Sequence, residues 1–518
     1  MIRPSGLRGS FAIGSAAAIL GFCCTVSAQQ NVDSPPPSGT TQDTQAIATQ
    51  LPKYKSQTDL VTVPVVILRK GKNVPGLSKD AFRLEENGKE QTISLFEEVQ
   101  PPTGVSTAAP ADRGFSNLPF DNASQLRLTI IVLDLLNTSL LQRTDGKDQI
   151  AKFLSKGLIP NQPVSLICLT SRGLKLVHPF STDASALIGA LNKVSLEPIT
   201  IMDRRNTVVR TIDQLREIAQ AYHGIPGRKT MIFAVGNIPE IAAEHEIIDN
   251  DRGYAEELRD MWQSLIDANI AVYPVQLMSW SRDPSLRGLA SRSNDMQLRN
   301  VAQFTGGNPC IEVNDLFGCM ARAVEDSRSY YLLGFSVQPN DRKPGWRDLK
   351  VKVSESHVDI RARDGFYYGI ATVRDAESTR KEEVNALASA LARSAVPMYV
   401  KVLGPASPPR PPAPEERKTV EFLITIPLSS VKIDVAQQRP LDLEVGAIAL
   451  TRDMREAGEF LHPVSGNPHP ENLRLWEQDG IKLREKMELP RGSFEIRFLV
   501  RDNNAGQIGT VVFPLDTQ

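Results

Sequence analysis

Residues 126–133 read LRLTIIVL, a run of apolar side chains that is typical of a parallel strand buried on both faces of a sheet. Similar short runs recur at 164–169, 230–235 and 270–276. Sequence with helical apolar spacing lies between them, most clearly at 207–222. Strands that alternate with helices predict an α/β domain with a mostly parallel sheet and helices on both faces, and we place this domain at residues 126–369.

Both flanks of this domain have the patterning of β structure. Residues 51–99 predict a β-hairpin module, in which Asn87-Gly88 is a strong hairpin turn. Residues 370–518 predict a small β-sandwich-like domain with a proline-rich loop at 404–417. Two polar stretches separate the parts: we interpret 29–50 as a disordered leader and 100–125 as a linker.

The first 28 residues have the three-part pattern of a secretory signal peptide. Arg3 and Arg8 precede a short apolar run at 11–24, and small residues lead to a predicted cleavage after Ala28. The run is too short to span a bilayer, and no later segment is long and apolar enough to do so. The sequence therefore predicts a secreted or periplasmic protein with no transmembrane segment after the signal peptide.

The composition narrows the class of partner. The 518 residues include 59 Lys and Arg against 60 Asp and Glu, a formal net charge of −1. A nucleic-acid-binding protein would favour a basic footprint, so we expect no nucleic acid as the main partner.

Three cysteines follow the predicted signal peptide. Cys168 lies in an apolar strand and is interpreted as a packed, unreactive thiol. Cys310 and Cys319 lie nine residues apart in a segment rich in Gly, Asn and Pro, and an oxidising compartment would allow them to form a local disulfide.

Six segments, in this order and spacing, resemble a von Willebrand factor type A domain, in the form found in the VWFA-related proteins of Acidobacteria. They are VTVPVVILRKGKNVPGLSKDAFRLEENGK (61–89), LTIIVLDLLNTS (128–139), GRKTMIFAV (227–235), ANIAVYPV (268–275), SRSYYLLGFSVQP (327–339) and RDLKVKVSESHVDIRARDGFYY (347–368). The resemblance implies a doubly wound, Rossmann-like fold for residues 126–369. It implies no nucleotide site, because no glycine-rich phosphate loop follows the first strand.

The resemblance also implies a divalent-cation site at the carboxyl ends of the strands, built from D-x-S-x-S, a later Thr and a later Asp. Here Asp134, Thr138 and Thr207 match three of these ligands and are the candidates for holding Mg²⁺ or Mn²⁺. Leu136 replaces the first serine and Gly236 stands in place of the aspartate, so the site is degenerate and no cofactor is expected. An alternative is that Asp134 and Asn137 cap the next helix or order the turn.

The candidate ligand-binding rim comprises the loops at 134–141, 201–207 and 236–240, together with one aromatic residue in a later loop. Its residues are Asp134, Asn137, Thr138, Thr207, Gly236 and Trp280. We found no G-x-S-x-G elbow and no C-x-x-C motif, and therefore expect no enzyme.

These observations favour an exported, non-enzymatic module of the adhesion type that binds a protein partner at the cell envelope or outside the cell. Two alternatives remain open at this point. The chain could be a structural scaffold of the envelope that associates through β-edges, or a surface hydrolase.

Overall fold

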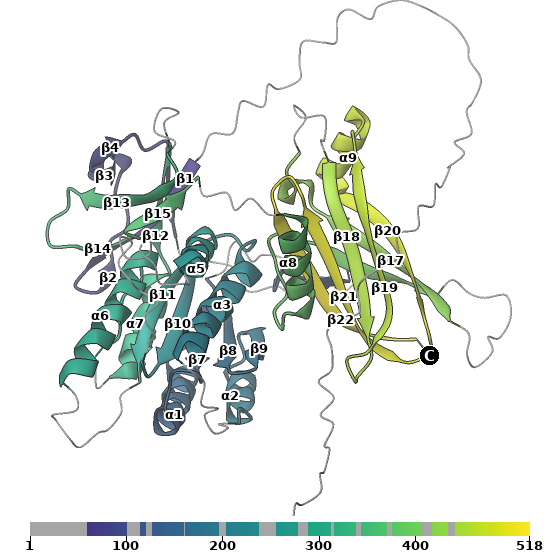
Figure 1. Ribbon diagram of the computed structural model, residues 1–518. Coiled ribbons are helices and arrows are strands. Elements are labelled where there is room, and N and C mark those ends of the chain that lie inside the picture. The colour runs from purple at the N-terminus through teal and green to yellow at the C-terminus, as the bar shows by residue number, and fades with distance from the viewer. Residues whose placement is uncertain are drawn as a thin grey trace, which may run out of the picture. The chain divides into compact units, whose positions relative to one another are not determined.

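The computed structural model describes residues 60–100, 114–120, 127–159, 161–195, 204–237, 255–277, 288–311, 315–337, 343–369, 375–405, 417–433 and 441–517 (Figure 1). The predicted signal peptide and leader lie outside these residues, as does most of the proline-rich loop.

The central α/β domain contains a five-stranded sheet with the order β11-β10-β7-β8-β9. Its strands are β7 (Thr129–Asp134), β8 (Val164–Thr170), β9 (Gly173–Ser181), β10 (Lys229–Val235) and β11 (Ile270–Gln276). Strands β7, β8, β10 and β11 are parallel, and the edge strand β9 is antiparallel to β8. The four parallel strands coincide with the four apolar runs, which confirms the prediction of a parallel sheet. Strand β9 was not anticipated from the sequence.

Helices cover both faces of this sheet, as the doubly wound fold requires (Figure 1). Ile130 and Val132 of β7 share a core with α3 (Arg204–Tyr222), α5 (Ala255–Asp267) and α6 (Gly288–Thr305). Ile131 and Leu133 point to the opposite face. There they share a core with α1 (Leu140–Lys156), α2 (Ala184–Asn192) and α7 (Leu316–Asp326). Successive residues of one buried strand therefore supply two separate cores.

Beyond β11 the sheet continues only as a short bridge. The backbone N–H of Cys310 donates to the carbonyl oxygen of Pro274, and the carbonyl oxygen of Cys310 accepts from Gln276. A disulfide joins Cys310 to Cys319 of α7. It fastens this bridge to a helix on one face of the sheet.

The apolar strand after α7 leaves the α/β domain, contrary to the boundary that we predicted. This strand, β12 (Tyr330–Ser336), pairs with β1 (Leu60–Arg69) and with β5 (Leu95–Val99). Likewise β13 (Gly345–Val353) pairs with β3 (Phe82–Glu86). The segment 51–99 is therefore no hairpin module of its own, because its strands are completed by residues that follow the α/β domain.

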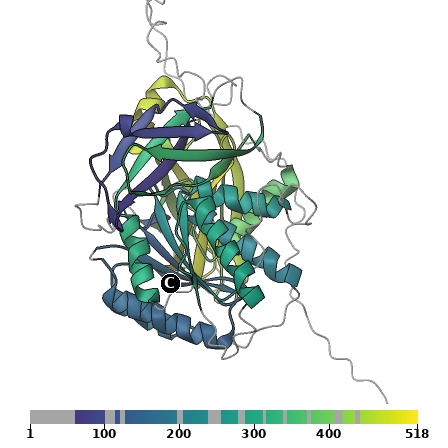
Figure 2. The same cartoon turned by 90° about the vertical axis from the view of Figure 1, so that its left-hand side faces the viewer.

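We call this unit, built from residues 60–99 and 330–368, the split β module. Its other strands are β2 (Lys72–Asn73), β4 (Lys89–Gln91), β14 (Asp359–Arg361) and β15 (Gly365–Tyr368). Two sheets result, β14-β1-β12-β5 with β2 beside β1, and β15-β13-β3-β4. In Figure 2 the purple N-terminal strands lie among the green strands that follow the α/β domain.

The predicted turn at Asn87-Gly88 joins β3 to β4. Both residues have positive φ angles, 48° and 76°, and Glu86 lies opposite Lys89 across the turn. This is the backbone conformation for which Asn-Gly is favoured in two-residue hairpin turns.

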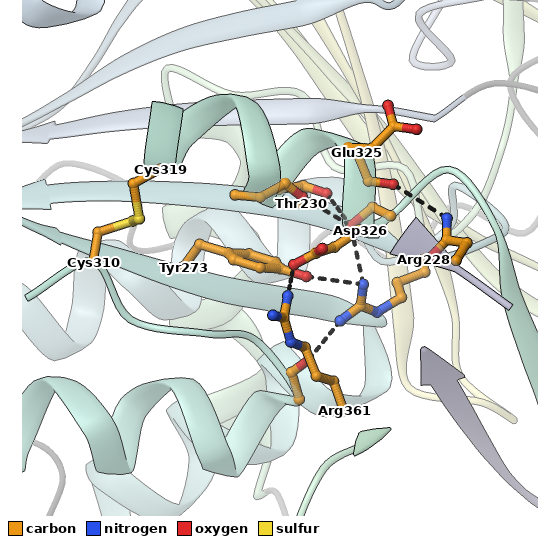
Figure 3. Close-up of polar contacts among 12 residues, drawn as sticks. Arg228, Thr230, Tyr273, Cys310, Cys319, Glu325, Asp326 and Arg361 are labelled. Atoms are coloured by element: carbon orange, nitrogen blue, oxygen red, sulfur yellow. Dashed lines mark hydrogen bonds and ion pairs between the residues drawn. A yellow bond between two sulfur atoms is a disulfide. The ribbon is translucent and has the colours of Figure 1, made fainter. Parts of the chain in front are cut away.

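Buried polar groups join the split β module to the base of the α/β domain (Figure 3). Arg361 of β14 forms an ion pair with Asp326 at the end of α7. Beside it, the Arg228 guanidinium donates to the Tyr273 hydroxyl at 3.3 Å and to the Ser327 hydroxyl at 3.0 Å. These contacts link β14, α7 and β11, and we assign this cluster a structural role.

The C-terminal part is a sandwich of two antiparallel sheets, β20-β17-β16-β6 and β19-β18-β21-β22, around a shared apolar core. The strands are β16 (Tyr399–Pro405), β17 (Lys418–Ile426), β18 (Leu441–Leu450), β19 (Glu456–Gly466), β20 (Ile481–Leu489), β21 (Ser493–Asp502) and β22 (Gln507–Asp516). Two helices accompany them, α8 (Ala376–Ala388) and α9 (Pro470–Asp479). The outer strand β6 (Phe115–Ser116) comes from the segment that we had interpreted only as a linker.

Candidate functional site

The candidate rim lies where β7, β10 and β11 reach their carboxyl ends, which is where open α/β sheets bind their ligands. Asp134 ends β7, Gly236 follows β10, and Leu277 follows β11. The structure brings together Asp134, Asn137, Thr138 and Gly236 through the hydrogen bonds described below. Trp280 lies outside the described residues, as do 201–203 and 238–240 of the predicted rim loops.

The Asp134 carboxylate is fully buried and already has hydrogen-bond partners. Its Oδ1 accepts from the backbone N–H of Leu136 at 2.7 Å and of Asn137 at 2.9 Å. Its Oδ2 accepts from Nδ2 of Asn137 at 2.6 Å. Burial raises the pKa of Asp134 to about 6, although these hydrogen bonds favour the ionised form. The contacts are those of an Asx turn, as in our alternative interpretation of Asp134 and Asn137.

A buried arginine, which the sequence did not point out, lies beside this carboxylate. Nε of Arg143 donates to the carbonyl oxygen of Thr138 at 2.9 Å, and Nη2 donates to that of Leu135. Its positive charge acts to lower the pKa of Asp134, against the larger effect of burial. The guanidinium thus braces both ends of the turn after β7.

Two further contacts join this turn to the neighbouring loop. The backbone N–H of Gly236 donates to the Thr138 hydroxyl at 3.0 Å, and that of Asn237 donates to the carbonyl oxygen of Asn137 at 2.9 Å. A Cβ atom at Gly236 would lie 2.6 Å from Oε1 of Gln142. The position at which the resemblance implies an aspartate therefore has no room for a side chain unless Gln142 moves.

Gln142 occupies this space as part of a capping box at the start of α1. Its Oε1 accepts from the backbone N–H of Ser139 at 3.0 Å, and its Nε2 donates to the carbonyl oxygen of Leu277 at 2.6 Å. The side chain therefore connects the loops that follow β7 and β11. A serine followed three residues later by glutamine is a sequence signal for such a cap, but it does not disclose the contact with Leu277.

Helix α3 reaches the turn through Thr211, one turn beyond the candidate Thr207. The Thr211 hydroxyl accepts from Nδ2 of Asn137 at 3.0 Å and donates to the carbonyl oxygen of Thr207 at 2.9 Å. Thr207, which the resemblance implied as a metal ligand, contacts Thr211 through its carbonyl oxygen, and it is Thr211 that hydrogen bonds to Asn137.

The residues present do not fit a divalent cation. Mg²⁺ requires six oxygen ligands in near-ideal octahedral geometry. Here both Asp134 oxygens accept hydrogen bonds, Leu136 offers no ligand atom, and the Arg143 guanidinium lies next to the carboxylate. No group of three or more His, Cys, Asp or Glu side chains suited to a metal occurs among the described residues. Asn137, Gln142 and Arg143 instead connect the loops directly.

Two large apolar side chains lie exposed on this braced rim. Leu140 and Leu141, the first residues of α1, are 51% and 84% exposed. Ser139 caps the helix immediately before them through its hydroxyl and Gln142. An adjacent exposed pair at the capped start of a helix is more informative than single apolar residues scattered over a surface.

The burial of Asp134 leads to a prediction on pH dependence. Because its pKa is higher in the folded protein, about 6 against 3.8, the folded state binds the proton more tightly. The contribution of this group to the free energy of unfolding is therefore fully present below pH 4 and is lost as the pH rises to about 6. The loss amounts to at most ~3 kcal/mol.

Asp134→Asn removes this titration. It also removes the carboxylate oxygen that accepts a hydrogen bond from Asn137, and this second loss of stability does not depend on pH. Urea unfolding of both proteins between pH 4 and 7 should show the variant gaining stability relative to the parent as the pH rises. Parallel stability curves would contradict the buried, titrating carboxylate.

Cys168, in β8, is a buried free cysteine. Burial raises the pKa of the Cys168 thiol to about 12, so at neutral pH it stays protonated and unreactive.

Within the described ranges, no helix has both the length and the apolar character needed to cross a membrane.

No protein-family model matches the chain, and no curated protein matches it. Solved structures share a partial likeness. An aerotolerance-related membrane protein from Bacteroides fragilis NCTC 9343, with multiple mutations to serines, is 15% identical, with a TM-score of 0.26. The match covers 39% of this chain and 98% of the other.

Two further solved structures are similar at the same level. Proximal thread matrix protein 1 from the mussel byssus, with a zinc-occupied MIDAS motif, is 7% identical over 41% of this chain and 48% of its own, with a TM-score of 0.26. The SpRpn10 VWA domain is 12% identical over 38% of this chain and 94% of its own, with a TM-score of 0.24. Likeness at this level carries no argument about function, which must come from the contacts of the site itself.

Proposed function

We propose that this chain is an exported, non-enzymatic member of the VWFA-related proteins, and that it binds a protein partner through the rim of its α/β domain without a bridging metal ion. The observation that carries the proposal is the exposed pair Leu140 and Leu141 in the first turn of α1, whose N-terminus is held by the capping hydrogen bonds of Ser139 and Gln142. The partner belongs to the cell envelope or the extracellular space, in agreement with the signal-peptide pattern of residues 1–28.

The order of the rim supports recognition by a preformed surface. Thr138, Gln142 and Arg143 fix the loop after β7 against its neighbours, so little conformational entropy is lost when a partner covers the leucines. Burying two leucines offers about 1.5–3 kcal/mol each, which suits an apolar anchor at the centre of a small interface.

Site-specific cross-linking tests this proposal. A photoreactive amino acid in place of Leu141 should trap a discrete partner in the envelope of the producing cells. The same group in place of Leu475, a 57% exposed residue of α9, should not trap it. With the purified partner, Leu140→Ser/Leu141→Ser should weaken binding at least about tenfold, whereas Leu475→Ser should not.

Metal dependence is a separate arm of this experiment. Addition of Mg²⁺ or of a chelator should leave the affinity of the parent protein unchanged, because the rim residues already satisfy one another. Equal trapping at both positions, or equal affinity of the serine variants, would refute the rim as the binding surface. Oligomers that form with rising concentration and ignore the rim variants would favour the scaffold instead.

A further inference from the structure

A groove of about 510 Å³ lies beside the edge strand β9, away from the residues of the rim. Residues 175–178 of β9 form one wall. Ala186, Gly189 and Ala190 of α2 form the other, and their small side chains leave the space between helix and strand open. Val194, just beyond the helix, closes one end.

The groove lies between α2 and the edge strand β9. Successive side chains of a strand point to opposite faces, so the side chains of one face alone would supply only alternate residues. Because four consecutive residues line the groove, its strand wall includes backbone as well as side chains. Among the residues that the structure describes, β9 pairs with β8 on one side and with no strand on the other. Such an edge offers backbone donors and acceptors to an added strand.

The charge of the groove is positive. Lys175 and Lys193 stand on opposite walls, and both are exposed. Neither ammonium group has a hydrogen bond or an ion pair with any residue that the structure describes. His178 adds an imidazole to the strand wall, and no Asp or Glu lines the groove. This charge suits an occupant that carries carboxylates.

We propose that an acidic, extended segment of a partner protein binds in this groove as an additional strand on β9. Its backbone pairs with the open edge over about four residues, or roughly 13 Å. Its apolar side chains rest against Val177, Ala186 and Val194, and its carboxylates reach Lys175 and Lys193. This surface is distinct from the rim and goes beyond the proposed function, so either can fail alone.

The probe for the test is a fluorescein-labelled, end-blocked peptide of about six residues with alternating Val and Glu, and fluorescence anisotropy with the full chain reports binding. Binding should weaken about five- to tenfold for Lys175→Glu or Lys193→Glu, because each reversal replaces an attraction by a repulsion. Lys401→Glu, the same charge reversal at an exposed residue of β16, should leave binding unchanged. Raising NaCl from ~0.05 M to ~0.5 M should weaken binding as well.

Two further arms separate strand addition from charge attraction. The same peptide with N-methylated valines retains its charge but cannot donate backbone hydrogen bonds, and it should bind at least about tenfold more weakly. Saturating peptide should slow hydrogen exchange in β9 and not in β11.

A steric variant completes the design. A Cβ atom at Gly189 would meet nothing within 4 Å, so Gly189→Phe projects into the groove without disturbing the packing beneath it. It should abolish binding, whereas Gly189→Ala, the matched control, should not. The proposal is overturned if the peptide does not bind, if Lys401→Glu weakens binding as much as Lys175→Glu, or if N-methylation has no effect. In those cases the lysines and Pro179 only protect the edge from aggregation.

Discussion

Arg347→Met is expected to lower the free energy of unfolding of the split β module by about 3–5 kcal/mol, because it leaves the Glu86 carboxylate buried without its counter-charge. The two side chains are 4% and 3% exposed and form an ion pair between β13 and β3. The guanidinium also donates to the carbonyl oxygen of Lys343 at 3.1 Å and lies 4.5 Å from the ring centre of Tyr368.

Hydrogen exchange in β3 and β13 measures this effect, since it reports the free energy of opening of these strands directly. The control is the double variant Arg347→Met/Glu86→Leu, which removes both charges and should recover most of the lost stability. If Glu86→Leu restores nothing in the Arg347→Met background, the arginine contributes through packing and not through its charge.

Trp262→Ala is the second change with a large expected effect. It should lower the free energy of unfolding by about 3–5 kcal/mol, because it leaves a cavity in place of the largest side chain in the core between the sheet and α5. Trp262 is 0% exposed and stacks on Phe304 with ring centres 5.0 Å apart. The ring centre of Phe304 lies in turn 5.3 Å from that of Trp346, a residue of the split β module. The loss of stability should therefore extend to both the α/β domain and the split β module.

Calorimetry should show the transition temperature of the α/β domain falling by about 10 °C for Trp262→Ala. Trp262→Phe keeps an aromatic ring against Phe304 and should cost clearly less. A similar decrease for both variants would mean that a contact of the indole nitrogen matters more than the filled volume.

Much of the α/β domain could be predicted from the sequence, because its signals are local. A run such as 230–235 is apolar at every position, and only a strand covered on both faces buries all of it, as β10 does. The partner of a strand is not a local property. Residues 330–335 carry the same kind of run, yet β12 joins the split β module, because β1 and β5 offer it complementary edges.

The candidate site was predicted in its location but not in its contacts. The resemblance implied that Asp134 and Gly236 lie at the carboxyl ends of their strands, and the structure places them there. The residues that brace it, Arg143 and Thr211, carry no motif, and their roles follow from distances that appear only after α1 and α3 have packed. Gln142 explains why Gly236 has no side chain, which sequence spacing could not show.

The interleaving of the split β module has a consequence for the order in which the protein can be made. A ribosome delivers β1 long before its partners, and the buried pair Glu86 and Arg347 lies 261 residues apart in the chain. Apart from the two-residue β2, β1 has no strand to pair with until residues 330–361 have emerged, after the entire α/β domain. During that interval LVTVPVVILR lacks the strands that cover it in the folded protein, so an apolar strand is exposed to aggregation until residue 361 has been made.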